Sequence, residues 1–292
     1  MSFQIFTDST ANLEKETAKE LSIEVIPFTY HMNGCEYILE DVKNFDDEAY
    51  YNLIRAGTSV TTSQINPSTY EEAFEKYLAN GTDVMFISLS SGISGSFQSA
   101  SVARDALLKK YPDRVISLID TLGASLGEGL NVIRAAKCCQ NGMSIRETEE
   151  RILSLIRRTC QIFIVDDLMH LKRTGRLSNV GAIVGSVMGI KPILKGNENG
   201  KIVAVQKVRG RKNAIRTLAE KYADLVVNAH NQLIGISHAN CPEDAEYLKS
   251  LILRKLPPKE IMMVKHEPVT GSHIGPSSLA LYFEGADDVR MK

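Results

Sequence analysis

Cysteine is scarce in this sequence, and its few positions form no pattern. The chain of 292 residues has five cysteines, an odd number, and none of them stands in a Cys-x-x-Cys spacing. This argues against a disulfide framework and against a thiolate metal cage. The six histidines are also scattered, without the spacing of a zinc site. We therefore expect a reduced, cytoplasmic protein without a bound metal.

Long apolar runs are absent as well. No stretch approaches the roughly 20 apolar residues that cross a bilayer. The start of the chain lacks a charged segment followed by an apolar stretch and a small-residue cleavage site, so it does not have the pattern of a signal peptide. Neither the Gly-x-Gly-x-x-Gly fingerprint nor the P-loop occurs. We expect no integral membrane association and no nucleotide cofactor.

The chain also has almost no net charge, since 34 basic and 35 acidic residues give −1. No overall field therefore draws it to nucleic acid or to anionic lipid, and any electrostatic partner has to be met locally. The composition, 43% hydrophobic and 24% charged, is that of an ordinary globular protein. At roughly 100 to 200 residues per domain, the length favours two domains or one large one.

Strands and helices alternate along the first half of the chain. Short apolar runs at residues 3–6, 84–89 and 115–119 each precede a polar turn and a helical pattern. Two β-prone runs flank Asn33-Gly34, which is the best short hairpin signal. The alternation predicts βαβ units on a parallel sheet, in an N-terminal α/β domain of residues 1–159.

The second half has a different pattern. A strand at residues 162–165 and a hairpin over 193–208 precede further strands and helices, which together predict a C-terminal α+β domain of residues 160–292. A glycine-rich apolar helix is expected over residues 180–189. The segment 271–276 is expected to be a loop before a last apolar strand.

Three hydroxyl-rich segments follow the predicted strands, at residues 61–63, 88–99 and 121–125. The carboxyl ends of parallel strands meet at one sheet edge, and helix N-termini there offer free N–H groups. These segments therefore suit a carboxylate or a phosphate. Helix capping alone is the alternative, because Ser and Thr are preferred cap residues.

One short run favours a different function. The GASLG run at residues 123–127 fits the Gly-x-Ser-x-Gly pattern of a nucleophile elbow, which makes Ser125 the candidate nucleophile of a serine hydrolase. Ser125 lies six residues beyond Ile119, however, which is long for a sharp strand-to-helix turn. No spacing selects among the residues that could complete the triad, which are Asp120, Asp166, Asp167, His238, His266 and His273.

His273 stands between Gly271 and Gly275, two glycines that permit close approach of the backbone. A histidine in such a setting can donate to an anion or transfer a proton near neutral pH. We therefore include His273 among the candidate site residues.

Basic side chains are concentrated between Lys172 and Lys212, where ten basic residues accompany one acidic residue. Such asymmetry is typical of a surface that docks an anionic ligand or an acidic partner. The segment lacks the interleaved aromatic residues that stack on bases, so we expect no nucleic acid. Arginine suits such a surface, because it offers a bidentate fork to carboxylates and phosphates.

Seven motifs together resemble the DegV family, in family order and over nearly the whole chain. They are TDSTA at 7–11, VTTSQINP at 60–67, ISLSSGISGSFQSA at 87–100, the DT-x-x-AS-x-G-x-G run at 120–129, LKRTGRLS at 171–178, GIKPIL at 189–194 and GSHIGP at 271–276. Members of that family are bacterial fatty-acid-binding proteins, and some present the bound acid to a separate fatty acid kinase.

The resemblance implies a two-domain α/β fold with the ligand between the domains. The carboxylate would be held by hydroxyls of Thr61, Thr62 and Ser94, with His273 nearby, and the acyl chain would lie in an apolar tunnel. The chain would then be a non-catalytic carrier whose partners are a long-chain fatty acid and a fatty acid kinase. Arg173, Arg176 and Arg209 are the candidates for docking that kinase, because they flank the two family motifs nearest the mouth of the site. The serine hydrolase, and an anion-responsive regulator without lipid, remain as alternatives.

Overall fold

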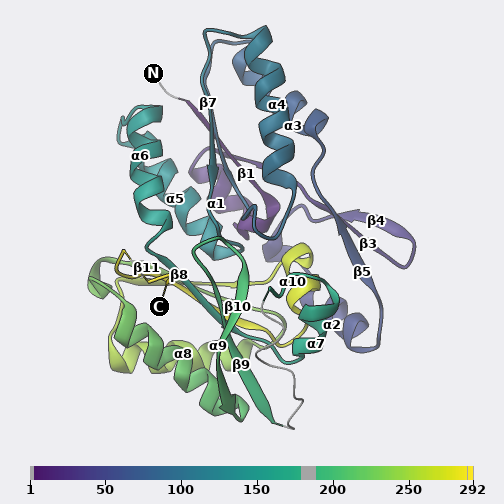
Figure 1. Cartoon of the computed structure of the whole chain (residues 1–292), viewed down its shortest axis with the longest axis vertical. Coiled ribbons are helices and arrows are strands. Elements are labelled where there is room, and N and C mark those ends of the chain that lie inside the picture. Colours follow the sequence, from purple (N-terminus) through teal and green to yellow (C-terminus); the bar gives the residue numbers. More distant parts are fainter. Residues whose placement is uncertain (1–2, 179–188, 288, 292) are drawn as a thin grey trace.

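The chain folds into two α/β halves, one above the other in Figure 1. The computed structural model describes residues 3–178, 189–287 and 289–291. The upper half contains a four-stranded parallel sheet, and the lower half contains a six-stranded mixed sheet. The predicted helix over 180–189 falls almost wholly outside the described residues. The division between residues 159 and 160 remains a prediction.

The parallel sheet is built from short runs that are apolar on both faces. Its order is β2-β1-β6-β7, with the bounds β1 Gln4–Asp8, β2 Ile23–Ile26, β6 Val84–Ser88 and β7 Ile116–Asp120. β6 is buried over its whole length. The chain runs from β1 outward to β2 and then returns to β6 on the other side of β1. Such a reversal of strand order opens a crevice at the carboxyl ends of the strands.

Helices cover both faces of this sheet (Figure 1). Val84 and Phe86 point toward one pair of helices, whereas Met85 and Ile87 point toward the other pair, as the alternation of a strand requires. The first pair is α3 Pro67–Leu78 and α4 Ser96–Lys110, and the second pair is α5 Leu126–Gln140 and α6 Ile145–Ile156. The short helix α1 Lys15–Glu20 connects β1 to β2.

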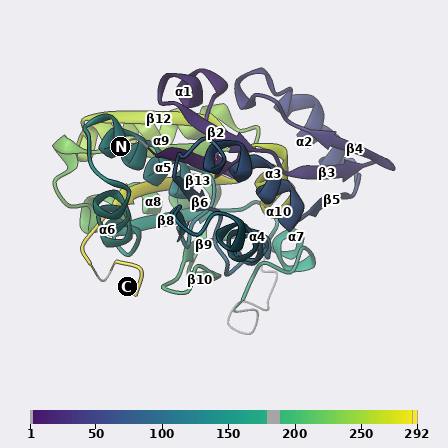
Figure 2. The ribbon, with the colours of Figure 1, turned by 90° about the horizontal axis from the view of Figure 1, so that it is seen from above.

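A small antiparallel sheet extends from the upper half, in the order β4-β3-β5. Its elements are β3 Thr29–Met32, β4 Cys35–Ile38, β5 Val60–Ser63 and the neighbouring helix α2 Asp47–Arg55. The predicted hairpin turn at Asn33-Gly34 is confirmed, and both residues have positive φ, 53° and 79°. Seen from above, this sheet lies at one end of the molecule (Figure 2).

Residues 61–63 were expected to follow a strand of the parallel sheet, and this prediction is wrong. They form β5 itself, in which Thr62 pairs with Tyr30 of β3. The β-branched residues of this stretch favour an extended strand. Alternation along β5 places Thr61 and Thr62 on opposite faces of the small sheet.

The lower half has the strand order β10-β9-β8-β13-β11-β12. The strands are β8 Thr159–Ile164, β9 Ile190–Gly196, β10 Ile202–Arg209, β11 Leu233–His238, β12 Glu260–Lys265 and β13 Leu279–Glu284. The helices are α7 Leu168–Arg173, α8 Arg211–Leu225, α9 Pro242–Lys255 and α10 Pro268–Ile274. Helices α8 and α9 pack on one face of the sheet, and the other face contacts α5. The predicted hairpin of β9 and β10 is confirmed.

Residues 271–276 were expected to form a loop, but most of them belong to α10. The Glu267 carboxylate accepts hydrogen bonds from the backbone N–H groups of Val269 and Thr270, each at 2.5 Å, and Pro268 begins the helix. Gly271 is required by packing rather than by a turn, because a Cβ there would lie 1.9 Å from the Tyr51 hydroxyl oxygen.

Candidate functional site

A cleft of about 590 Å³ lies between the two halves, beside the loop that follows β6. Both halves contribute to its walls. Its polar lining residues are Thr62, Ser63, Gln64, Ser91, Ser94, Arg176, Ser178, Thr270 and His273. This is the crevice that the reversed strand order predicts.

Thr62 and His273 meet across this cleft from β5 and α10. The Thr62 hydroxyl oxygen lies 2.9 Å from His273 Nε2, although the two residues are 211 positions apart in the sequence. Within the described chain, the buried Nδ1 of His273 has no hydrogen-bond partner. Burial, with a further contribution from the charge of Arg176, lowers the pKa of His273 to about 3. The imidazole is therefore neutral near pH 7.

Ser94 occupies the loop that connects β6 to α4. Its hydroxyl lies 3.2 Å from that of Ser96 and also accepts a hydrogen bond from the Ser96 backbone N–H. The loop is packed against the residue that follows β5, since a Cβ on Gly95 would lie 2.2 Å from Gln64 Oε1. This packing fixes the Ser94 loop relative to Thr62.

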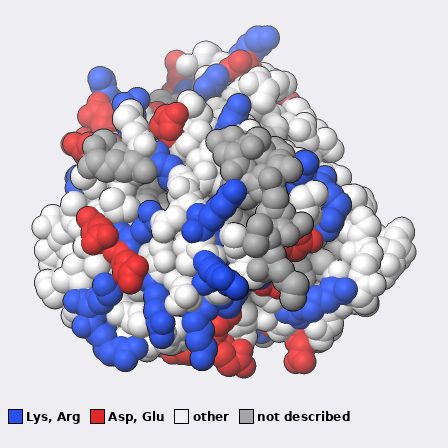
Figure 3. Space-filling view, turned by 60° about the horizontal axis from the view of Figure 1, so that its bottom comes forward, with Lys and Arg blue, Asp and Glu red and all other residues white. Residues whose placement is uncertain are grey.

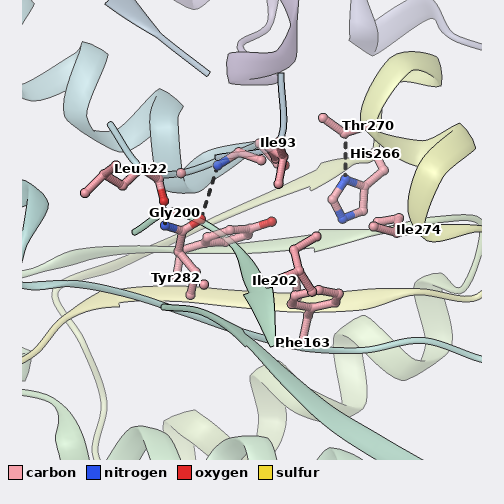
Figure 4. Close-up of a pocket in the computed structure, with 15 residues that line it drawn as sticks. Ile93, Leu122, Phe163, Gly200, Ile202, His266, Thr270, Ile274 and Tyr282 are labelled. Atoms are coloured by element: carbon pink, nitrogen blue, oxygen red, sulfur yellow. Dashed lines mark hydrogen bonds between the residues drawn. The ribbon is translucent and has the colours of Figure 1, made fainter. Parts of the chain in front are cut away.

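An apolar cavity continues inward from the cleft (Figure 4). Ile93, Ala124, Ile202, Thr270 and Ile274 line both spaces, so the two are adjacent. Farther in, the wall consists mainly of Leu122, Phe163, Ala280 and Tyr282 together with glycines. The inner cavity measures about 60 Å³. The arrangement therefore has a polar mouth and an apolar end.

A second cleft, of about 570 Å³, adjoins the first. Thr62, Arg176 and His273 border both clefts, whereas Thr61, His170 and Arg173 line only the second. The structure thus brings Thr62, Ser94 and His273 together and places Thr61 on the neighbouring side.

The three candidate docking arginines have different surroundings. Arg176 is half-buried in the wall between the two clefts, where burial lowers its pKa. Arg173 is exposed and pairs with Asp167 at 3.2 Å. Arg209, at the end of β10, is exposed and is absent from the walls of both clefts. Sequence reasoning assigned Arg176 to docking and did not place it beside the head-group residues.

The surplus of positive charge is smaller than the sequence suggested. Lys191 pairs with Asp166, and Arg211 pairs with Asp244 at 2.8 Å. Asp166 and Asp244, like Asp167, lie outside residues 172–212, the stretch over which the charge was counted. Lysine and arginine side chains nevertheless spread over the middle and lower part of the face shown in Figure 3.

A buried network of acids and hydroxyls supports the cleft from behind. The Thr10 hydroxyl contacts Asp8 Oδ1 and lies 3.0 Å from Glu128 Oε2, and the Thr7 hydroxyl lies 2.8 Å from Glu128 Oε1. Asp8 also accepts a hydrogen bond at 3.2 Å from the backbone N–H of Leu89, which lines the cleft. Burial raises the pKa of Asp8 to about 6, and burial together with the Asp8 charge raises the pKa of Glu128 well above its usual range.

The predicted elbow residue Ser125 has an unusual backbone but lacks a base. Its φ and ψ are 53° and −136°, and its side chain is buried. Its hydroxyl has no hydrogen-bond partner among the described residues. His266 lines the same cavity, but its two ring nitrogens face the hydroxyls of Ser237 and Thr270. The nucleophile–base hydrogen bond of a hydrolase is therefore missing.

The parts of the chain that the structure describes contain no candidate metal site. No group of three or more His, Cys, Asp or Glu side chains there is arranged to hold a metal ion. Among the same residues, no helix has the length and apolar character needed to span a membrane.

The fold and the site define a two-half α/β protein with a cavity between the halves that is polar at the mouth and apolar at the end. A family model described as "Uncharacterised protein, DegV family" matches residues 2–285. A DegV domain-containing protein of Clostridium perfringens is 39% identical over 283 residues, which are 97% of each chain. The chain therefore belongs to the DegV family.

Solved structures of the family share the fold. A DegV family protein from Thermus thermophilus, whose structure is described as fatty acid binding, has 26% identity and a TM-score of 0.87, with 98% of this chain and 100% of that chain covered. DegV of Bacillus subtilis, described as a fatty acid binding protein, has 29% identity and a TM-score of 0.82, with 98% and 100% covered. The predicted family and fold class are confirmed.

Proposed function

We propose that this protein is a non-catalytic carrier that binds one long-chain fatty acid and presents it to a fatty acid kinase. The observation that supports the proposal is the cleft itself, where hydroxyls and a guanidinium border a space that continues into an apolar cavity. The fatty acids bound by the relatives from Thermus thermophilus and Bacillus subtilis support the same ligand class.

The carboxylate would lie at the polar mouth. A carboxylate removed from water needs several donors, which the hydroxyls of Thr62 and Ser94 can supply. Arg176 adds a positive charge in the same wall, and neutral His273 can donate its Nε2–H to the Thr62 hydroxyl, whose own proton is then free for the carboxylate. Thr61 stays a predicted ligand, although its side chain lines the neighbouring cleft.

The acyl chain would follow the apolar lining inward past Ile93. Each buried methylene contributes about 0.8 kcal/mol, so the tail supplies most of the binding free energy. Because the inner cavity is only about 60 Å³, a long chain has to shift side chains such as Leu122 and Ile274.

The second cleft supports presentation of the carboxylate to another protein. It borders Thr62, Arg176 and His273 and shares no lining residue with the apolar cavity proposed for the tail, so a phosphate donor in this cleft would reach the carboxylate without meeting the tail. Arg173 lines this cleft at the surface and is the proposed point of docking. Phosphorylation of the carboxylate would give an acyl phosphate, and we propose that the carrier acts in the cytoplasm.

The test is native mass spectrometry of the purified protein, followed by extraction under denaturing conditions. We expect one fatty acid per chain, or uptake of one equivalent of added fatty acid. An extract without acyl species and no uptake of added fatty acid would overturn the proposal and favour an anion-responsive regulator. Labelling of Ser125 by a fluorophosphonate would instead favour the hydrolase.

A further inference from the structure

Arg290 is a buried cation whose partners are all backbone carbonyls. Its side chain is 4% exposed. Nε donates to the carbonyls of Ile156 at 3.0 Å and Thr159 at 3.1 Å. Nη1 donates to Leu122 at 2.8 Å and Asn197 at 3.2 Å, and Nη2 lies 3.4 Å from the Thr121 carbonyl. Within the described chain, no carboxylate pairs with this guanidinium.

These carbonyls belong to three separate segments of the chain. They are the loop after β7, the connection from α6 to β8, and the turn between β9 and β10. The first and the last of these segments form the inner wall of the apolar cavity, through Leu122, Gly196 and Gly200. In Figure 4, Leu122 and Gly200 lie beside each other on one side of the pocket. Arg290 is therefore behind this wall and joins its two parts.

The wall is assembled by close contact between backbones. A Cβ on Gly200 would lie 3.0 Å from Leu122 Cα and 2.1 Å from Ser90 Oγ. A Cβ on Gly92 would lie 2.6 Å from the Asn199 carbonyl oxygen. Among the described residues, two other side chains donate to these carbonyls: Gln161 to the Leu122 carbonyl at 3.3 Å and Ser90 to the Gly200 carbonyl at 2.9 Å. The guanidinium is thus the group that connects the turn directly to the loop after β7.

We propose that Arg290 is a positioning residue that fixes the inner end of the apolar cavity and thereby sets the longest acyl chain that the protein accepts. This inference rests on the proposed function. Without the guanidinium, the carbonyls of Leu122 and Asn197 lose the donor that they share. Each keeps another donor, Gln161 Nε2 for Leu122 at 3.3 Å and the Gly200 N–H for Asn197 at 3.0 Å, but neither of these donors joins the turn to the loop after β7. The turn between β9 and β10 can then move away from Leu122, which deepens the cavity without changing its mouth.

The test compares Arg290→Met with the parent protein in competition for saturated fatty acids of about 12 to 22 carbons. Bound acids are quantified by mass spectrometry. Methionine keeps much of the apolar volume and removes every donor. We expect the ratio of the longest to the preferred acid to rise about tenfold, the size expected when two further methylenes find apolar contacts. The affinity for the preferred acid should change less than threefold.

Arg158→Met is the matched control. Arg158 holds the same C-terminal segment, through Glu284 at 2.8 Å and the Gly285 carbonyl, but does not contact the wall. Its chain-length profile should equal that of the parent. An unchanged profile in folded Arg290→Met, or the same shift in Arg158→Met, would overturn the proposal.

Two further measurements separate the possible failures. If Arg290→Met does not fold, Arg290→Lys decides, because an ammonium can still reach up to three carbonyls. A smaller shift toward longer acids supports the proposal, and an unchanged profile overturns it.

If even the parent binds no fatty acid, the proposed function fails. Faster amide hydrogen exchange at residues 196–201 in Arg290→Met, but not in Arg158→Met, would then still support the role of Arg290 in the wall.

Discussion

Each hydroxyl has one proton, so Thr7 and Thr10 cannot be the donors in all the hydrogen bonds in which they take part. The Thr7 hydroxyl lies 2.9 Å from the Ile87 carbonyl, which can only accept, so its contact with Glu128 needs a proton from the carboxyl group. Thr10 has one proton and two carboxyl neighbours. The network is complete when both Glu128 and Asp8 are protonated, which agrees with the raised pKa of each.

This proton count predicts how Glu128→Gln changes stability with pH. The pKa of Glu128 is raised in the folded state, so its stabilising contribution is present below about pH 4.5 and is lost as the pH rises toward the folded pKa. Glutamine does not ionise and can bond to both hydroxyls. We expect the free energy of unfolding of the variant to rise relative to that of the parent as the pH increases from about 5 to about 7.

Urea unfolding across this pH range measures the difference. Glu150→Gln is the control, because Glu150 is an exposed carboxylate that pairs with Arg146 on the surface of α6. If the free energies of unfolding of Glu128→Gln and of the parent changed with pH in parallel, ionisation of Glu128 would not destabilise the folded state.

Thr62 and Ser94 carry the next prediction, since each would donate a hydrogen bond to the carboxylate. Thr62→Val and Ser94→Ala should each weaken fatty acid binding by about 1.5 to 3 kcal/mol, which is roughly tenfold to a hundredfold. Thr61→Val is the matched control on the opposite face of β5 and should weaken binding less. Isothermal titration with the delipidated protein measures all three. Unchanged affinity in both Thr62→Val and Ser94→Ala would place the head group elsewhere.

At the scale of elements, α10 depends on the fit between Gly271 and Tyr51. The Tyr51 hydroxyl donates to the His266 carbonyl at 2.9 Å and occupies the space of a side chain at position 271. We expect Gly271→Ala to destabilise the protein by about 2 to 3 kcal/mol, because overpacking forces backbone or side-chain shifts. Chemical denaturation measures this loss.

The double variant Gly271→Ala with Tyr51→Phe tests the cause. Removal of the hydroxyl opens part of the space, so the double variant should lose less stability than the sum of the two single changes. A ring carbon of Tyr51 would still lie 2.9 Å from the new Cβ, so the rescue should be partial. Additive losses of stability would mean that the contact with Tyr51 does not limit the size of the side chain at position 271.

The same element shows what the sequence could and could not predict. Apolar runs predicted β6 and β7 correctly. A strand that is buried on both faces is apolar along its length, so the local sequence is enough to recognise it. Helix α10 was missed because two glycines in a short segment favour a loop, whereas its helix depends on the Glu267 cap and on Tyr51, a residue more than 200 positions away. Spacing alone could not bring Thr62 to His273, because that contact depends on how the two halves pack; the family resemblance supplied it.

At the scale of the whole molecule, charge is distributed locally even though the net charge is −1. We expect the double variant Arg173→Ala with Arg209→Ala to keep its fatty acid affinity. It should lose about tenfold in acyl phosphate formation by a fatty acid kinase at low salt, and the loss relative to the parent should shrink at high salt, where screening already weakens the attraction of these arginines in the parent. A coupled assay at saturating lipid measures the rate.

The control for these arginines is Arg146→Ala with Arg254→Ala, which removes two exposed charges that line neither cleft and should leave the rate unchanged. If the double variant at 173 and 209 loses lipid binding but keeps full activity at saturating lipid, these arginines belong to the pocket, and docking occurs elsewhere.

Helix α5 belongs to two hydrophobic cores at once. Val132 and Ala135 pack with the parallel sheet, whereas Leu126 and Leu130 pack with Phe163 and Tyr282 of the mixed sheet. Unfolding of α5 would therefore expose apolar surface in both halves. The two halves have separate strand orders, but we expect them to melt in a single cooperative transition because they share α5.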